Sequence, residues 1–259
     1  MILEQIVRRK KDEISCLMAS DPARLPRADR DFGQALGRGR SEVRLIAEVK
    51  RASPSAGLLT SDFDPVEIAH AYQGGGAAAV SVLTDRDFFG GSIDDLRRVS
   101  EGVSLPVLRK DFVIDERQIH EARDAGAHAI LLIAAILDRK TMQRFLAESR
   151  ALGMEPLVEI HDERERDVAL EAGASIVGIN NRNLDDFRID TGTTFRLAAG
   201  LPHGLTIVSE SGVESESGVA ALVGHADAVL VGTALMRSAD RKGFAAALVK
   251  AGRNRADEQ

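Results

Sequence analysis

Five charged or amide side chains end, or closely follow, short apolar runs of this chain. They are Lys50 after IAEV, Lys110 after PVLR, Glu159 in PLVEI, Asn180 after IVGI and Glu210 after TIVS. Short apolar runs are typical of buried strands, and a buried strand rarely ends on such a group unless that end faces a solvated cavity. Amines and carboxylates confined in one cavity shift one another's pKa values, which suits acid–base catalysis. We therefore expect these five residues to meet at one polar site.

The first of these runs carries a second charge. Glu48 lies two residues before Lys50, so an extended strand places both side chains on one face. An ion pair with a structural role explains these two residues. It does not explain why Lys110 and Glu159 stand at the ends of other runs. The wider set of charges favours a shared site for proton transfer.

Two loops in the last quarter of the chain have the composition of an anion site. They are SESG, Ser209–Gly212, and VGTAL, Val231–Leu235. Gly212 and Gly232 permit close approach of the backbone to a ligand. The hydroxyls of Ser211 and Thr233 are further donors. In barrels of alternating strands and helices the loops after the last two strands commonly bind phosphate, so the pair favours a phosphate site over merely structural turns.

A regular alternation of strand and helix patterns separates these residues. Eight runs have strand composition: 45–50, 78–84, 106–110, 129–134, 156–160, 176–180, 206–209 and 228–231. Between them lie segments with helical spacing, for which Asp138 and Asp162 are expected N-caps. The alternation predicts an α/β fold, a (βα)8 TIM barrel, because a barrel brings the carboxyl ends of all its strands to one mouth. An open doubly wound sheet is the alternative, but its sites gather around one switch point.

The length of the chain fits one such barrel. The fold commonly needs about 250 residues, and we expect residues 1–259 to form a single domain. Within it, residues 1 to about 40 are expected to form an N-terminal helical extension, because Ile2, Ile6, Ile14 and Leu17 have amphipathic helical spacing. Two interpretations stay open: the extension covers the bottom of the barrel, or it packs near the mouth and helps to cover the substrate.

The composition limits the partners and the setting of the protein. Its 34 basic and 40 acidic side chains give a formal net charge of −6, which argues against non-specific binding to nucleic acid or to membrane surfaces. Cys16 is the one cysteine, so neither an intrachain disulfide nor a Cys-based metal site is expected. The longest apolar run, 129–137, is too short to span a bilayer, and the N-terminal segment lacks the pattern of a secretory signal. These features favour a cytoplasmic location.

Six segments at the expected strand ends form a highly specific set. They are IAEVKRASPSAG (46–57), PVLRKDFVID (106–115), LVEIH (157–161), GINNRNL (178–184), VSESG (208–212) and VLVGTALM (229–236). In this order, and over nearly the whole chain, they resemble the indole-3-glycerol phosphate synthase family of tryptophan biosynthesis. Departures from the family pattern are small: Ala56 stands where a basic residue is common, and Gly90-Gly91 follows Phe89. The resemblance implies the same (βα)8 fold as the alternation of elements.

The resemblance also implies a reaction. The family converts 1-(2-carboxyphenylamino)-1-deoxyribulose 5-phosphate to indole-3-glycerol phosphate, CO₂ and water. Ring closure at a carbonyl needs a proton donor, a departing carboxylate needs positive charge, loss of water needs an acid, and the phosphate needs an anchor. No step is a redox step, so no cofactor is implied, and no metal is expected. The implied partner is a phosphorylated small molecule, while association with other tryptophan-pathway enzymes stays open.

By the same resemblance, each motif residue has an expected role. Lys110 is the expected general acid of ring closure, and Glu159 is the expected acid or base of dehydration or final proton removal. Lys50 is expected to attract the anionic groups of the substrate and to take part in proton transfer. The expected supporting residues are Glu48 and Asn180 for orientation, Glu210 for holding a lysine, Ser53 and Ser211 for hydrogen bonds, and Pro54 for the shape of the first loop. The expected phosphate ligands are Arg182, Ser211, Gly212, Gly232 and Thr233, and the expected walls of the ring pocket are Phe89, Phe112 and Leu184.

Simpler interpretations stay open for several residues. The turn 180–183 could satisfy only its own backbone, and Phe89 and Phe112 could be plain core residues. Arg109 is expected to point away from the barrel interior, because neighbouring strand residues alternate. The charged run 162–167 is interpreted as a solvated helix face, and His161 as structural or solvated. The alternative functions are another phosphate-binding barrel enzyme, such as phosphoribosylanthranilate isomerase, tryptophan synthase α subunit or a Schiff-base aldolase, and a non-enzymatic binding module.

Overall fold

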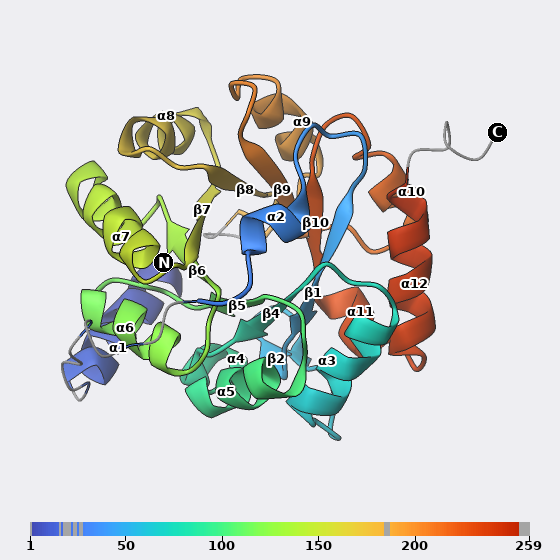
Figure 1. The fold of residues 1–259 in the computed structure, drawn as a ribbon, viewed down its shortest axis with the longest axis horizontal. Coiled ribbons are helices and arrows are strands. Elements are labelled where there is room, and N and C mark those ends of the chain that lie inside the picture. The colour runs from blue at the N-terminus through green and yellow to red at the C-terminus, as the bar shows by residue number, and fades with distance from the viewer. Residues whose placement is uncertain are drawn as a thin grey trace.

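Eight parallel strands close into a barrel in the computed structural model, which describes residues 2–15, 17, 22, 25, 28–183 and 187–253. The barrel strands are β1 (Arg44–Val49), β4 (Ala79–Leu83), β5 (Val107–Lys110), β6 (Ala129–Ile133), β7 (Glu155–Ile160), β8 (Ile176–Asn180), β9 (Thr206–Glu210) and β10 (Ala228–Val231). Strand β1 pairs with both β4 and β10, which closes the ring seen in Figure 1. The predicted (βα)8 architecture is confirmed, and the open sheet is excluded.

Helices surround this ring of strands (Figure 1). They are α3 (Pro65–Gly74), α4 (Arg86–Phe89), α5 (Ile93–Gly102), α6 (Glu116–Asp124), α7 (Arg139–Ala151), α8 (Glu163–Ala172), α9 (Gly192–Ala198), α10 (Glu216–Ala220), α11 (Thr233–Arg237) and α12 (Arg241–Ala251). The expected N-caps are confirmed, since Asp138 accepts a hydrogen bond from the Thr141 N–H and Asp162 accepts one from the Glu165 N–H. Each cap pairs an N–H that the first turn of its helix leaves without a partner.

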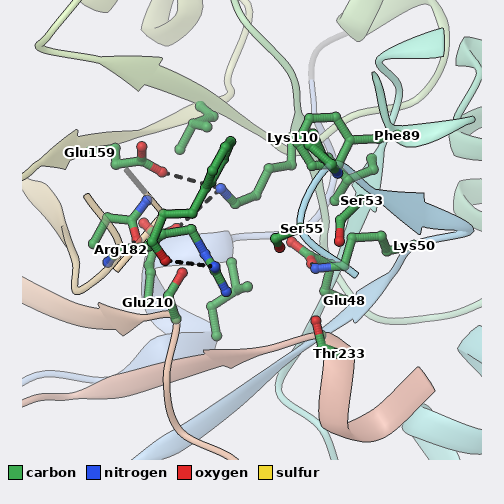
Figure 2. Close-up of a pocket in the computed structure, with 18 of the residues that line it drawn as sticks. Glu48, Lys50, Ser53, Ser55, Phe89, Lys110, Glu159, Arg182, Glu210 and Thr233 are labelled. Atoms are coloured by element: carbon green, nitrogen blue, oxygen red, sulfur yellow. Dashed lines mark hydrogen bonds and ion pairs between the residues drawn. The ribbon is translucent and has the colours of Figure 1, made fainter. Parts of the chain in front are cut away.

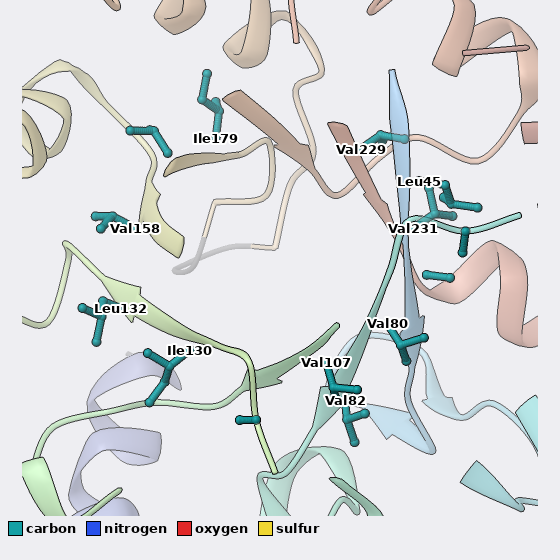
Figure 3. Packing of buried hydrophobic residues seen from close by; sticks show 14 of the residues in the cluster. Leu45, Val80, Val82, Val107, Ile130, Leu132, Val158, Ile179, Val229 and Val231 are labelled. Atoms are coloured by element: carbon teal, nitrogen blue, oxygen red, sulfur yellow. The ribbon is translucent and has the colours of Figure 1, made fainter. Parts of the chain in front are cut away.

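Strand alternation sorts the apolar side chains into two layers. One set, which includes Val80, Ile130 and Val158, points outward and packs beneath the helices (Figure 3). The other set, which includes Leu108 and Leu157, fills the barrel interior. Both layers are built mostly from aliphatic residues, in keeping with an aromatic content of 4%. Because the interior is packed below, the polar residues at the strand ends face the open mouth above it.

Arg109 follows this alternation as expected. Its guanidinium leaves the barrel interior and reaches helix α6, where it donates a hydrogen bond of 2.7 Å to the Gln118 carbonyl and lies 2.8 Å from the Glu121 carboxylate. Its neighbour Lys110 therefore points inward. Two adjacent basic residues thus serve different layers, one fastening a helix and the other reaching the mouth of the barrel.

The N-terminal extension is divided between the two ends of the barrel. Helix α1 (Ile2–Ser15) lies at the mouth, where Ile6 joins the interior core from above. Helix α2 (Phe32–Leu36) plugs the bottom, where Gly33 approaches the first residue of β8. Each of the two interpretations of the extension is therefore right for one part of it.

The first loop after β1 contains a small hairpin that the sequence pattern did not predict. Strands β2 (Ala52–Ser53) and β3 (Gly57–Leu58) pair antiparallel. Gly57 adopts a φ of +66° at the turn, a conformation that strongly favours glycine. The Ala56 N–H donates to the Ser53 hydroxyl at 3.2 Å. These local bonds give the loop a defined shape beside the mouth.

Candidate active site

One cavity at the mouth of the barrel holds the residues that the sequence marked for chemistry. It encloses about 1140 Å³ of empty space, counted out to its open side. All of the expected site residues that the structure describes line it: Glu48, Lys50, Ser53, Pro54, Phe89, Lys110, Phe112, Glu159, Asn180, Arg182, Glu210, Ser211, Gly212, Gly232 and Thr233. Leu184 lies outside the described residues. The strand ends therefore do meet at one site, while the role of each residue stays a prediction.

Lys110 lies between two carboxylates at the centre of this cavity. Its Nζ is 3.2 Å from Glu159 Oε2 and 3.2 Å from Glu210 Oε2 (Figure 2). The three residues come from β5, β7 and β9, so no short segment of sequence could create the contact. Both carboxylates are almost fully buried. The result is an ammonium group held by two buried acids, facing a space large enough for a substrate.

A glycine makes room for the second carboxylate. A Cβ atom added at Gly178 would lie 2.0 Å from Glu210 Oε1, so any larger residue in this position of β8 would push the carboxylate aside. Among the described residues, neither oxygen of Glu210 accepts a hydrogen bond. Its contact with Lys110 is an ion pair, and both of its oxygens are buried.

The pKa values of this group are set by burial and by mutual attraction. Burial alone would lower the pKa of Lys110, but the charges of Glu159 and Glu210 outweigh it and raise that pKa. Burial opposes ionisation of Glu159 too, yet Lys110 and then His161 hold its pKa below the ordinary value. For Glu210, burial and the charge of Glu159 win over Lys110 and raise the pKa to about 7. The two carboxylates beside one lysine thus ionise at different pH, Glu159 well below Glu210.

A second ion pair stands on the opposite side of the cavity. Lys50 Nζ is 2.7 Å from Glu48 Oε1, and Figure 2 shows this pair beside Ser53 and Thr233. A Cβ atom at Gly232 would lie 2.2 Å from Glu48 Oε1, so this glycine permits the close approach. Lys50 is more exposed than Glu48, with 13% of its side chain accessible against 5%. The lysine therefore offers its charge to the cavity while the glutamate anchors it.

The loop after β9 is fixed in an unusual backbone conformation. Ser211 has a φ of +64° and Gly212 a φ of +82°. The buried side chain of Asn181 holds this loop by donating to the Ser211 carbonyl at 2.9 Å, and it accepts the Thr194 N–H at 3.0 Å. The turn at Asn181 therefore fastens the neighbouring loop and does more than satisfy its own backbone. Positive φ in a residue other than glycine is costly and often marks a functional site.

Asn180 and Phe187 hold Arg182 in place. The Asn180 side chain accepts the Arg182 N–H at 3.0 Å, and the guanidinium donates to the Phe187 carbonyl at 3.3 Å. Arg182 lines the same cavity as Ser211. A guanidinium carries five N–H donors, and its position near a glycine-containing loop suits it to an oxyanion.

Much of the rest of the cavity wall is apolar, although Ser55, Asp111 and Glu214 also line it. The rings of Phe89 and Phe112 lie 6.2 Å apart, centre to centre, and both face the cavity. Opposite the polar strand ends, helix α1 adds Ile2, Leu3 and Ile6. The amphipathic pattern had indicated this helix, but not which end of the barrel it covers, because both ends offer an apolar surface.

His161 belongs to the surroundings of the site, which fits the structural alternative of the sequence interpretation and not the solvated one. Its Nε2 lies 3.4 Å from Glu159 Oε1, and its Nδ1 lies 2.9 Å from Glu165 Oε2. Glu165 therefore does not belong to a purely solvated helix face, although its neighbours in the run are mostly exposed. Burial alone would lower the pKa of His161, but the two carboxylates raise it to about 10. The signal in the sequence was the spacing of His161 and Glu165, which a helix start brings together.

Two negative findings concern the described part of the chain alone. There, no three His, Cys, Asp or Glu side chains are placed to hold a metal ion. In the same residues, no helix combines the length and the apolar character needed to cross a bilayer.

Solved structures share the barrel at low sequence identity. Thiamine phosphate pyrophosphorylase from Pyrococcus furiosus matches with a TM-score of 0.60 and 14% identity, over 82% of this chain and 96% of the other. A structure described as native KDPGal matches with a TM-score of 0.59 and 18% identity, over 83% of this chain and 97% of the other. At these identities the likeness shows the fold and nothing of the function.

Sequence comparisons are more specific. Indole-3-glycerol phosphate synthase from Chlorobium phaeovibrioides is 47% identical over 247 residues, which cover 92% of this chain and 95% of the relative. The protein of the same name from Mycolicibacterium smegmatis is 50% identical over 211 residues, which cover 81% and 78%. The family model described as indole-3-glycerol phosphate synthase matches residues 3–248. Together with the geometry of the cavity, these matches establish that the chain belongs to the indole-3-glycerol phosphate synthase family.

Proposed function

We propose that Lys110, held between Glu159 and Glu210, is the proton-transfer centre of the reaction that defines this family. As a family member the chain is a carboxy-lyase that forms indole-3-glycerol phosphate in tryptophan biosynthesis. The observation that carries the proposal is the pair of 3.2 Å contacts between the Lys110 ammonium and two buried carboxylates. This arrangement keeps the lysine charged and fixed in direction before substrate binds.

In the ring-closure step, Lys110 is the acid. The ring carbon that carries the carboxylate attacks the carbonyl carbon, and the carbonyl oxygen becomes an alkoxide. An alkoxide is a stronger base than an amine, so proton transfer from Lys110 runs downhill even though the pKa of this lysine is raised. The carboxylate then leaves as CO₂, and its bonding electrons return to the ring. A proton donor aimed at the developing charge lowers the barrier of this step.

Glu159 is better suited to accept a proton than to donate one. Lys110 and His161 contact its two oxygens and favour the ionised form. The new hydroxyl takes up one further proton, which solvent supplies through the open side of the cavity, and leaves as water. One proton must then be removed from the neighbouring ring carbon to complete the aromatic indole ring. We assign this removal to Glu159. Asn180 faces the same carboxylate and, with Glu48, orients the substrate and Lys110.

Lys50 and the two late loops bind the anionic ends of the substrate. Lys50 offers a positive charge to the carboxylate, which must stay in place until it leaves. Arg182 and the backbone N–H groups of Ser211, Gly212, Gly232 and Thr233 form the phosphate site. The fixed positive φ of Ser211 supports this assignment, because successive N–H groups in such turns form concave anion sites.

The apolar wall holds the aromatic ring of the substrate. Phe89 and Phe112 face the cavity from α4 and from the loop after β5. Ile2 and Ile6 cover the ring from α1. Ser53 and Pro54 shape the hairpin loop that borders the same space. Exclusion of water by these residues strengthens the charge interactions at Lys110.

The proposal includes the setting of the enzyme. We propose that residues 1–259 act as a single domain on a phosphorylated small molecule, without nucleic-acid or membrane partners and without a cofactor. The location proposed is the cytoplasm. The net charge of −6 and the single cysteine support this setting.

The role of Lys110 is tested by its replacement. We expect Lys110→Ala to lower kcat by about 10²- to 10⁴-fold, the usual contribution of a general acid, with a much smaller rise in KM. The control is Lys140→Ala, at an exposed position of α7. Steady-state kinetics on both variants decide the question. A rise in KM with kcat unchanged would mean that Lys110 only binds the substrate.

A further inference from the structure

His161 lies outside the cavity, yet it stands between two carboxylates that belong to different parts of the site. Glu159, whose carboxylate lines the cavity, lies 3.4 Å from Nε2. Glu165, in the first turn of α8, lies 2.9 Å from Nδ1 and also accepts the His161 backbone N–H at 2.8 Å. The His161 side chain is mostly buried, with 14% of its surface exposed.

The chemistry of the ring restricts its charge. A neutral imidazole carries one N–H, so one of its nitrogens presents a lone pair. In this position that lone pair would face either Glu159 or Glu165, and both are acceptors when ionised. Only the protonated ring turns an N–H toward both carboxylates: Nδ1 is within hydrogen-bond distance of Glu165, and Nε2 faces Glu159 across an ion-pair contact of 3.4 Å without forming a hydrogen bond. The attraction of these two carboxylates raises the pKa of His161 to about 10.

We infer that His161 is a positioning residue of the active site, which fixes the orientation and the ionised state of Glu159. The inference deepens the proposed function, since it rests on the role of Glu159 in proton removal. Lys110 holds Oε2 of Glu159 and His161 holds Oε1, so each oxygen has one cation. Without His161, the carboxylate would keep a single cation and share it with Glu210.

Other side chains of the described residues also surround the contact between His161 and Glu159. On β5, Lys110 faces Glu159; on β9, Glu210 faces Lys110; on α8, Glu165 faces the far side of His161. Asn180 on β8 adds a neutral contact to Glu159. His161 is therefore the second cation that acts on the proposed base. Its removal should change the pH at which Glu159 ionises, which a structural role alone would not do.

Two replacements separate the parts of this role. In His161→Gln the amide takes the place of Nε2 and still donates toward Glu159, but the charge is lost. In His161→Asn the shorter amide reaches only the place of Nδ1, so Glu159 loses its partner as well. We expect kcat to fall about tenfold in H161N and less in H161Q, with KM nearly unchanged. In both, the acid limb of the kcat–pH profile should move up by about one unit, because a cation is removed.

Three further measurements make the result decisive. His203→Asn, at an exposed turn, is the matched control and should leave the profile unchanged. Nitrogen NMR of the imidazole should find His161 protonated on both nitrogens at neutral pH, and Glu165→Gln should lower its titration midpoint. Glu159→Gln, run in parallel, should lose activity; if it does not, the proposed function fails on its own account.

The inference is overturned if Glu159→Gln is inactive while H161N keeps the wild-type kcat and pH profile. It is also overturned if nitrogen NMR finds the His161 ring neutral at neutral pH. If H161N fails to fold, H161Q tests the inference, because the acid limb of its kcat–pH profile must still move to higher pH. Thermal unfolding of each variant establishes that the kinetics refer to folded protein.

Discussion

Individual residues in this site act through the charges of their neighbours. Lys110 remains an ammonium because two carboxylates outweigh its burial, and Glu159 remains a carboxylate because two cations contact it. For Glu210, burial and the charge of Glu159 outweigh the attraction of Lys110, so the pKa of this carboxyl group is raised. Glu210 therefore gains and loses its proton near neutral pH, while Glu159 stays ionised there. Similar side chains acquire opposite states from their surroundings.

This difference predicts how stability depends on pH. The pKa of Glu210 is raised in the folded state from 4.5 to about 7, so the folded protein holds a proton that the unfolded chain has released in this window. The stability due to neutral Glu210 is complete below pH 4.5 and is lost as pH rises through about 7. Glu210→Gln stays neutral and lacks this loss. We expect the free energy of unfolding of the wild type, relative to E210Q, to fall across the window.

Urea unfolding of both proteins from about pH 5 to pH 8 measures this difference. Other titrating groups occur in both proteins and largely cancel. Glu101→Gln, at an exposed position of α5, is the matched control. A difference between wild type and E210Q that stays flat across the window would contradict the raised pKa of Glu210.

At this scale the sequence predicted which residues gather, but not which of them touch. The polar strand ends marked Lys110 and Glu159 because charges are rare in buried runs. The contact of Glu210 with Lys110 depends on Gly178. This glycine lies on β8, between β9 and β5 in the strand order, and its missing side chain leaves the space that the Glu210 carboxylate occupies. The role of His161 was missed because its partner Glu165 lies in a charged run that is mostly exposed. Spacing alone does not distinguish an inward-turned carboxylate from a solvated one.

Among the elements, helix α1 is attached to the barrel by buried ion pairs. Lys10 is buried and lies 3.0 Å from Asp85 and 2.9 Å from Asp111, which follow β4 and β5. Asp85 in turn caps α4, the helix that carries Phe89 into the cavity. One lysine therefore ties α1 to two other segments that border the site. Burial alone would lower the pKa of Lys10, but the neighbouring carboxylates raise it.

Removal of this lysine should loosen α1. Lys10→Met leaves the buried carboxylate of Asp85 without its cation, while Asp111 keeps Arg109 at 3.2 Å. Removal of one partner of a buried ion pair typically costs about 3–5 kcal/mol. We expect a loss of stability of that order in urea unfolding, and a rise in KM because α1 supplies Ile2 and Ile6 to the cavity. The control is Arg9→Met, one residue away, which removes an exposed ion pair with Asp87 and should change stability little. Equal stability of the two variants would contradict the role given to Lys10.

The order of the barrel elements could be predicted well because each strand is a short apolar run with a polar end. The bounds of β8 and β10 agree with the sequence pattern, and the others differ by a residue or so. The placement of α1 and α2 could not be predicted, because the interior core is apolar at both ends of the barrel. The β2–β3 hairpin was missed because two-residue strands leave no periodic signal.

On the scale of the whole molecule, the barrel turns distant residues into neighbours. Its closed ring brings groups from β1, β5, β7, β8 and β9 to one mouth, with an aliphatic core beneath them and α1 above. The site then has an aromatic end, a proton-transfer centre and an anion-binding end. The chain is poor in aromatic residues and contains no tryptophan. That absence gives the protein a low background in the assay that tests it best.

The most direct test is formation of the indole product by the purified chain. The substrate is 1-(2-carboxyphenylamino)-1-deoxyribulose 5-phosphate, with no cofactor or metal added, and the signal is indole fluorescence. We predict a rise at a rate proportional to enzyme concentration, which Lys110→Ala reduces to near the background. No rise in fluorescence from folded wild-type protein at high concentration would contradict the assignment of this cavity.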